Sequence, residues 1–85
     1  MKLKYILTRT GAFALFSEVH THADMARGMY GDIVSAGFCH LSVAYNDGNP
    51  EIKYRMNCYG ESISLKLKSR PEDSDIISNK LNNPY

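Results

Sequence analysis

The stretch from Ile52 to Lys68, IKYRMNCYGESISLKLK, decides the fold, because it predicts two strands joined by a tight turn. Apolar residues alternate with polar ones up to residue 59, and the alternation resumes from Ser62 onward. Alternation with a period of two is typical of a strand that has one buried face. A glycine at the first position of a two-residue loop favours a type II′ turn. We therefore predict a hairpin that reverses at Gly60-Glu61.

A two-residue loop determines which residues lie opposite each other in this hairpin. Apolar residues then meet apolar ones, in the pairs Cys58 with Ile63, Met56 with Leu65 and Tyr54 with Leu67. The other face has two pairs of like charges, Arg55 with Lys66 and Lys53 with Lys68. Like charges directly across a sheet are destabilising. An acidic segment of this chain, an acidic partner or a phosphate-bearing ligand could compensate for this repulsion. The alternative is that the long side chains spread into water and lose little stability.

Length and composition indicate one small domain that comprises residues 1–85. With 44% hydrophobic residues, the chain is too apolar to be disordered and long enough for a modest core. The formal net charge of +1 excludes a strongly basic nucleic-acid-binding protein but not a local basic patch. We see no signal peptide and no apolar run of membrane-spanning length. We therefore expect a cytoplasmic protein that does not associate with a membrane.

The first third of the chain predicts two strands and a short helix. The strands are expected over residues 2–9 and 12–19, joined by a turn at Thr10-Gly11. Large apolar groups on both faces of the second strand indicate a central strand or one covered on both sides. Thr21 and Asp24 have the spacing of a capping box, so we expect a short helix over residues 22–29.

A long strand is predicted over residues 33–45, followed by a loop of turn-forming residues over 46–49. Ala36-Gly37 suggests a bulge or a close backbone contact near the start of this strand. An even loop places one apolar set opposite another, namely Cys39, Leu41 and Val43 over Met56, Tyr54 and Ile52. An odd loop would instead turn a different set to that face, namely His40, Ser42 and Ala44.

A second helix is predicted to begin near Ser69, which forms a capping box with Glu72. Pro71 is tolerated there because the first turn of a helix does not use its N–H. The elements then follow in the order strand, strand, helix, strand, strand, strand, helix. This order predicts an α+β fold, in which an antiparallel sheet of about five strands is covered by two helices, mainly on one face.

The predicted register gathers basic and aromatic residues on the polar face of the last three strands. The candidate ligand-binding residues are Phe38, His40, Lys53, Arg55, Tyr59, Lys66 and Lys68. Cations suit phosphate or carboxylate groups, and aromatic rings can stack on bases. Three alternatives remain open: a solvated face, rings that pack under a helix or a second subunit, and a face neutralised by the acidic segment 72–75.

The sequence contains no constellation that predicts catalysis or metal binding. His20 and His22 are of a type that binds metals, but another ligand would have to come from elsewhere, and a helix cap explains Asp24. Cys58 and His40 are predicted on opposite faces of the sheet, which disfavours a Cys-His pair. No Gly-rich phosphate loop, paired-acid site or EF-hand loop is present. We expect a protein that is not an enzyme and that needs neither a metal nor a cofactor.

Cys39 and Cys58 lack CxxC or zinc-site spacing, which indicates small buried residues in a reducing compartment.

Two functional hypotheses follow from the sequence. The first hypothesis is a non-enzymatic module that self-associates, most simply as a homodimer, because two of its strands carry apolar groups on both faces. The second is a protein that binds an anion, a nucleotide or single-stranded nucleic acid through the basic face.

Overall fold

The computed structural model describes residues 1–46 and 49–83, with side chains described outside residues 44–52. Its elements are β1 (Lys2–Thr8), β2 (Phe13–Phe16), α1 (His22–Ala26), β3 (Ile33–Asn46), β4 (Asn49–Tyr59), β5 (Glu61–Ser62), β6 (Leu67–Lys68) and α2 (Asp73–Asn82). The first four strands form an antiparallel sheet in the order β2-β1-β3-β4, and β5 and β6 form a separate two-stranded sheet. The predicted α+β class is confirmed, with roughly the expected number of strands.

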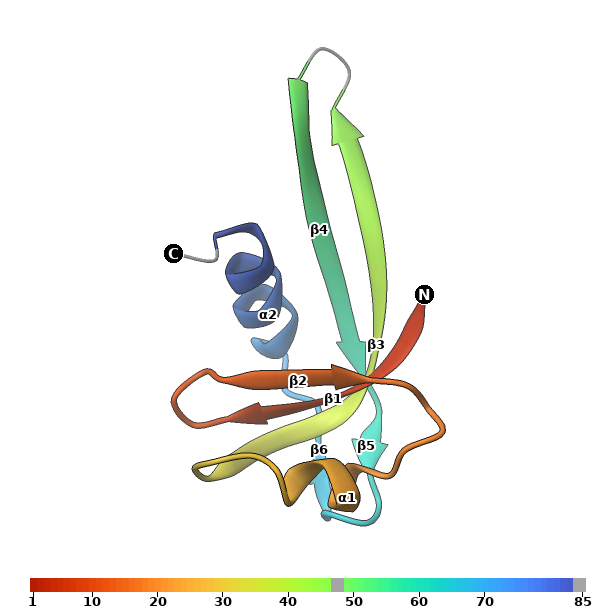
Figure 1. Cartoon of the computed structure of the whole chain (residues 1–85), viewed down its shortest axis with the longest axis vertical. Helices are drawn as coiled ribbons and strands as arrows, with labels where there is room; N and C mark the ends of the chain where they lie inside the picture. The colour runs from red at the N-terminus through yellow and green to blue at the C-terminus, as the bar shows by residue number, and fades with distance from the viewer. Residues whose placement is uncertain (47–48, 84–85) are drawn as a thin grey trace.

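The predicted hairpin at Gly60-Glu61 does not form. Gly60 has the positive φ that the turn requires, 76°, but the chain only bends there and continues into β5 (Figure 1). The reversal follows over residues 63–66, so that Glu61 pairs with Lys68. This turn contains no glycine, and Lys66 itself adopts a φ of 55°, so turn-forming residues do not mark it in the sequence. All the pairs predicted across residues 60 and 61, including the like-charge pairs, are therefore wrong.

Helix α2 occupies the edge of β4 where the predicted strand would have paired. Three of its side chains accept hydrogen bonds from outward N–H groups of the strand. Ser74 accepts from Cys58 at 2.8 Å, Ser78 from Met56 at 2.9 Å and Asn82 from Tyr54 at 2.8 Å. Asn82 also donates to the Tyr54 carbonyl at 2.9 Å. Four residues of helix rise about 6 Å and two residues of strand about 6.7 Å, so the two repeats match. The helix thus takes the place of a fifth strand.

Ser78→Ala tests this edge contact. We expect it to lower the free energy of unfolding by about 1–2 kcal/mol, because the N–H of buried Met56 would lose its acceptor. Urea unfolding followed by circular dichroism measures the change. Asn79→Ala, at an exposed position of the same helix, is the matched control and should change stability by less than about 0.5 kcal/mol. Equal losses in the two variants would contradict a specific role for the Ser78 hydroxyl.

The four-stranded sheet has an apolar core on each face. The core on the α2 side is made of buried Tyr5, Leu7, Cys39, Met56 and Ile77. The core on the opposite side is made of Ile6, Phe16 and Ala36, with α1 and the β5–β6 hairpin packed against it. The helices therefore cover opposite faces, whereas both are predicted mainly on one face. The reason is that β1 has large apolar residues on both faces, so each face needs its own cover.

The pairing of β3 with β4 confirms the predicted faces but not the predicted register. Cys39 pairs with Cys58 rather than with Met56, which is a shift of two residues along β4. A two-residue shift keeps every side chain on its face, because the pleat has a period of two. The predicted turn includes Asp47 and Gly48, which lie outside the described residues. The ladder is also irregular between Tyr45 and Asn46, which accounts for the shift.

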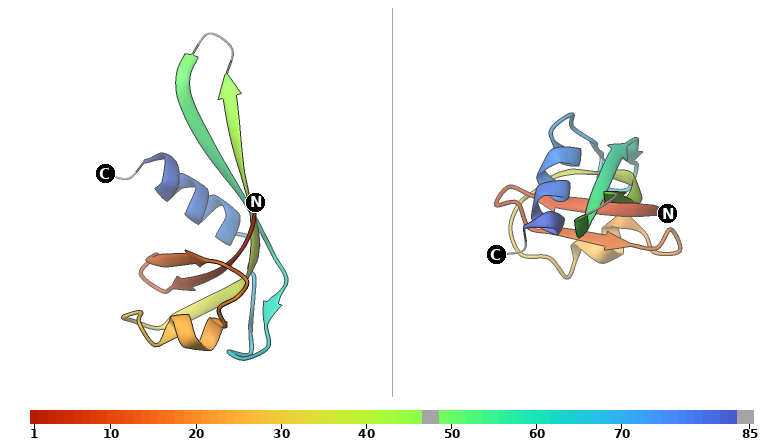
Figure 2. Two further views of the ribbon diagram at one scale, coloured as in Figure 1. Left: turned by 45° about the vertical axis from the view of Figure 1, so that its right-hand side comes forward. Right: turned by 90° about the horizontal axis from the view of Figure 1, so that it is seen from above.

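β3 and β4 extend beyond the other strands as a two-stranded ribbon, which Figures 1 and 2 show projecting from the rest of the molecule. We call its part beyond β1, residues 42–46 and 49–55, the arm. It accounts for the elongated shape of the chain, whose extents are 44 × 24 × 22 Å.

Gly37 makes the close backbone contact that the sequence predicts for β3. A Cβ atom at Gly37 would lie 2.6 Å from the carbonyl oxygen of Tyr59 and 3.2 Å from that of Gly60. The carbonyl of Gly37 is also 2.8 Å from Nε2 of buried His22. Since a carbonyl only accepts, Nε2 of His22 carries a proton. His22 is thus a residue of the core, and the structure does not bring it together with exposed His20 as a pair of ligands.

The two helix starts differ in how well the sequence predicts them. Thr21 caps α1 and accepts the N–H of Asp24 at 3.1 Å, as predicted, although the helix ends early at Ala26. The predicted Ser69–Glu72 box is wrong, because α2 begins at Asp73 and Glu72 makes no side-chain cap bond. The N–H of Arg70 is instead accepted by the Asp73 carboxylate, one residue further along.

Candidate ligand-binding face

Strands β1, β3 and β4 share a face that carries most of the basic residues of the sheet. Cross-strand partners lie on the same face, and the register places Lys2 opposite His40, Lys4 opposite Phe38 and Phe38 opposite Tyr59. Arg55 and Lys53 follow Tyr59 at even spacing along β4. We call this surface the basic face and define it as Lys2, Lys4, Phe38, His40, Lys53, Arg55 and Tyr59.

The structure brings together part of the predicted ligand-binding set. The members that share the basic face are Phe38, His40, Lys53, Arg55 and Tyr59. Lys66 and Lys68 lie elsewhere, on the β5–β6 hairpin, where they line a separate hollow with Glu61 and Arg70. The predicted cluster of four cations is therefore wrong, because it depended on a hairpin that does not form.

Lys2 and Lys4 belong to the basic face but are absent from the predicted set. Their alternation with Leu3 and Tyr5 does predict that both lysines lie on one face of β1. Which strand β1 pairs with is decided by contacts between distant parts of the chain. Only the pairing of β1 with β3 therefore places these lysines beside His40 and Phe38.

Four aromatic rings form a row from the core to the surface of the basic face. The centroids of Phe16 and His22 are 5.6 Å apart, those of His22 and Phe38 are 5.9 Å apart, and both pairs meet edge to face. Phe38 and Tyr59 are stacked, 6.1 Å apart with 24° between their planes. Tyr59 is 41% exposed, and Lys2 Nζ lies 5.3 Å from the Phe38 centroid. The row therefore ends in the accessible Tyr59 ring, and a cation lies over the Phe38 ring behind it.

The outer end of this row borders a hollow of about 570 Å³. Its walls are the rings of His22, Phe38 and Tyr59 together with Lys2, Lys4, Thr21, Gly60, Glu61, Ile63 and Ser64. Gly60 leaves room for the Phe38 ring, since a Cβ atom there would lie 3.0 Å from Phe38 Cδ2. An apolar hollow with amines at its rim can accept a flat ring that carries negative charge.

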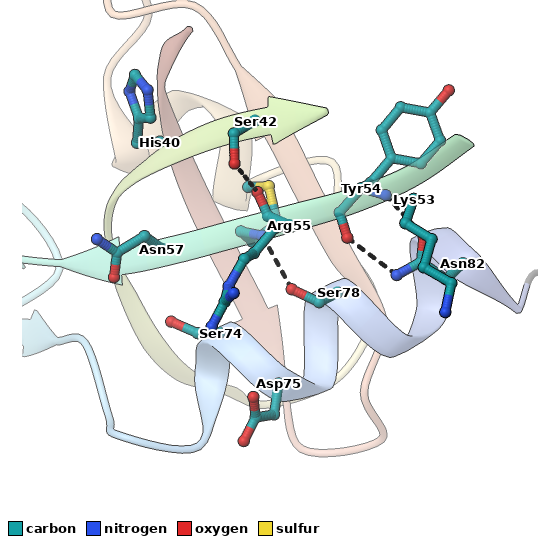
Figure 3. Close-up of a pocket in the computed structure, with 11 residues that line it drawn as sticks. His40, Ser42, Lys53, Tyr54, Arg55, Asn57, Ser74, Asp75, Ser78 and Asn82 are labelled. Atoms are coloured by element: carbon teal, nitrogen blue, oxygen red, sulfur yellow. Dashed lines mark hydrogen bonds between the residues drawn. The ribbon is translucent and has the colours of Figure 1, made fainter. Parts of the chain in front are cut away.

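A groove of about 700 Å³ separates the arm end of the basic face from α2 (Figure 3). Figure 3 shows the Arg55 side chain extending toward Ser74 and Asp75. The ion pairs among the described side chains involve neither Lys53 nor Arg55. Of the three acids in the segment 72–75, only Asp75 lines this groove. The segment therefore brings one carboxylate near the face, and among the described side chains this carboxylate forms no ion pair with Lys53 or Arg55.

Asp73 is a buried carboxylate that anchors the start of α2. The Tyr5 hydroxyl donates to its Oδ2 at 2.6 Å, while the Arg70 N–H and Nε donate to its two oxygens at 2.9 and 3.0 Å. Burial by itself raises the pKa of a carboxyl, but these hydrogen bonds outweigh it and hold the pKa of Asp73 below its ordinary value. Burial and the Asp73 carboxylate raise the pKa of Tyr5. The cluster joins α2 to β1.

The two cysteines lie opposite each other on the α2 side of the sheet, as free thiols. Burial raises the pKa of Cys39 to about 12 and also raises the pKa of Cys58. Neutral thiols are poor nucleophiles and poor metal ligands. His40 lies on the opposite face from Cys58, as predicted, so the geometry does not assemble a Cys-His pair.

Neither a metal cluster nor a membrane-spanning helix is present in the described part of the chain. Among residues 1–46 and 49–83, no three histidine, cysteine, aspartate or glutamate residues gather closely enough to hold a metal ion. Neither described helix has the length and apolarity needed to cross a bilayer.

Comparison of the chain with protein-family models, curated proteins and solved structures found no match. Fold and surface together define a small α+β protein with an antiparallel sheet and one basic face.

Proposed function

We propose that this chain is a non-enzymatic interaction module that forms a homodimer through the edge of β3 in the arm. One observation carries the proposal. The edge of β3 that faces away from β4 has backbone groups without a strand partner in the described chain, whereas α2 occupies the opposite edge of the ribbon.

The unpaired part of the outer β3 edge, which we call the free edge, begins beyond the N-terminal end of β1. β1 starts at Lys2 opposite His40, and Met1 extends the pairing to Leu41 through backbone bonds of 2.8 and 3.1 Å. The N–H and C=O of Val43 point to the same side as those of Leu41, because backbone direction alternates along a strand. Within the described residues, no strand pairs with Val43 on that side. Such an edge is a template for pairing with another strand.

A second copy of the same edge is the partner that this geometry favours. Two β3 edges can pair in antiparallel orientation about a twofold axis, which gives both chains identical contacts. Val43 and Tyr54 form an exposed cross-strand pair, 44% and 38% exposed, which would continue as an apolar strip across the joined sheet. Because α2 occupies β4 from Cys58 to Tyr54, association through β3 alone yields a closed pair rather than a filament.

The apolar faces of β2, which motivate self-association in the sequence, do not support it in the structure. Phe13 and Leu15 pack into the core on the α2 side, while Ala14 and Phe16 pack into the core on the α1 side. The chain therefore covers both faces of β2 by itself. Support for a dimer comes from the arm instead.

Size-exclusion chromatography with light scattering tests the proposal, with a dimer mass expected at high micromolar concentration. Val43→Pro removes the outward N–H but spares the ladder with β4, so this variant should be a monomer. Val43→Thr keeps the N–H and should remain a dimer. A wild-type chain that is monomeric at high micromolar concentration would end the proposal. A Val43→Pro variant that stays dimeric would show that the β3 edge is not the interface.

A further inference from the structure

We infer that the basic face binds single-stranded nucleic acid, an activity that does not depend on self-association. The inference comes from the placement of cations from three strands beside a stacked pair of rings. Neither the cations nor the rings are adjacent in the sequence, and the tertiary fold brings them onto one surface.

The charges on the face favour an anionic ligand. Its basic side chains are Lys2, Lys4, His40, Lys53 and Arg55, and β1, β3 and β4 add no carboxylate to it among the side chains that the structure describes. Among the described side chains, acids lie only at its margins: Glu18 is 3.4 Å from Lys2, Glu61 borders the ring hollow, and Asp75 lines the groove beside Arg55. All three acids are exposed, and exposed ion pairs contribute little, so phosphates can displace them.

The cations form a row, not a cradle around one point. Lys53 and Tyr59 are six residues apart on β4, which corresponds to about 20 Å at the rise of a strand. A single small anion would need donors that converge on it, as a bidentate arginine does. A row of this length instead suits consecutive phosphates of a polymer. A positively charged groove that follows the backbone is the common feature of proteins that bind single strands.

The rings select a single strand over a duplex. Tyr59 exposes its ring at the rim of the hollow, and Phe38 supports it by stacking from behind. A base can stack on Tyr59 only when its own face is accessible, which is the case for an unpaired base and not for one inside a duplex. Stacking of this kind tolerates all four bases. The ligand is therefore a single strand that is bound without strong sequence preference.

Fluorescence anisotropy with a labelled oligothymidylate of about 16 nucleotides tests the inference. Wild-type protein should bind at about 50 mM salt and bind far more weakly at about 200 mM. The Lys53→Glu/Arg55→Glu double variant should lose at least about tenfold in affinity, because it reverses two charges of the row. Lys66→Glu/Lys68→Glu changes the net charge equally on the β5–β6 hairpin, and this matched control should stay within about threefold of wild type.

Tyr59→Leu separates stacking from charge. It keeps an apolar side chain at the rim and should weaken binding by about 5- to 100-fold, with the same salt dependence as wild type. Undetectable binding of the wild type at about 50 mM salt would overturn the inference. Equal losses of affinity in the two double variants would also overturn the inference, because they would show that binding depends on net charge only. A duplex of the same length that binds as tightly as the single strand would overturn the role of the rings.

Discussion

Asp73→Asn is expected to lower the free energy of unfolding by about 2–4 kcal/mol at neutral pH. The carboxylate is fully buried and accepts hydrogen bonds from the Tyr5 hydroxyl and from the backbone and side chain of Arg70. An amide has the same shape but only one acceptor oxygen, so at least one of these donors loses its partner. Arg70 is 35% exposed, so its charge can reach water, which keeps the loss below that of a fully buried pair.

The same carboxylate makes stability depend on pH. Because the pKa of Asp73 lies below its ordinary value of 3.8 in the folded chain, its contribution is complete above that value. The contribution is lost as the pH falls through the lower pKa of the folded state. Wild type should therefore lose more stability than Asp73→Asn between neutral pH and about pH 3. Urea unfolding of both proteins at the two pH values measures this difference.

Glu72→Gln is the matched control for Asp73→Asn. Glu72 lies in the same turn and also pairs with Arg70, at 3.5 Å, but its side chain is 53% exposed. Exposed pairs are worth at most about 1 kcal/mol, so Glu72→Gln should change stability little and should keep the acid dependence of wild type. Equal losses of stability and equal acid dependence in the two variants would contradict a larger contribution from the buried Asp73 carboxylate.

Gly37→Ala is expected to lower the free energy of unfolding by about 3 kcal/mol, toward the upper end for an overpacked site. The added methyl group would lie 2.6 Å from the Tyr59 carbonyl oxygen, and this neighbour is backbone rather than a flexible side chain. Relief therefore requires the end of β4 to move away from β3. Such a movement would also separate Tyr59 from Phe38, its stacking partner. Near-UV circular dichroism should report the change around the rings, and urea unfolding should report the loss of stability.

Gly28→Ala is the control for the added methyl group. The nearest atom to a Cβ at Gly28 is the Met25 carbonyl oxygen at 3.8 Å, an ordinary contact. This substitution should leave stability unchanged or raise it by about 0.5 kcal/mol, because alanine restricts the unfolded chain. A Gly37→Ala protein as stable as Gly28→Ala would contradict the close approach of β4 to β3.

Local pattern predicts the parts of this fold that depend on neighbouring residues. Period-two alternation correctly predicts which side chains of β3 and β4 share a face, even though the register is shifted by two. Thr21 and Asp24 mark the start of α1, and Gly37 marks a close backbone contact. These features follow from the geometry of a few adjacent residues, so the sequence determines them by itself.

The tertiary structure alone decided what occupies the edge of β4 that faces away from β3. Both the strand predicted after Gly60 and the polar side of α2 can satisfy the outward N–H groups of β4, and nothing local separates these outcomes. The helix is favoured because the same placement buries Ile77 in the core and joins Asp73 to Tyr5, which is 68 residues away. That choice removes Lys66 and Lys68 from the basic face. The pairing of β1 with β3 instead adds Lys2 and Lys4 to that face, on the other side of β3. Such pairing of distant strands depends on the packing of the whole chain.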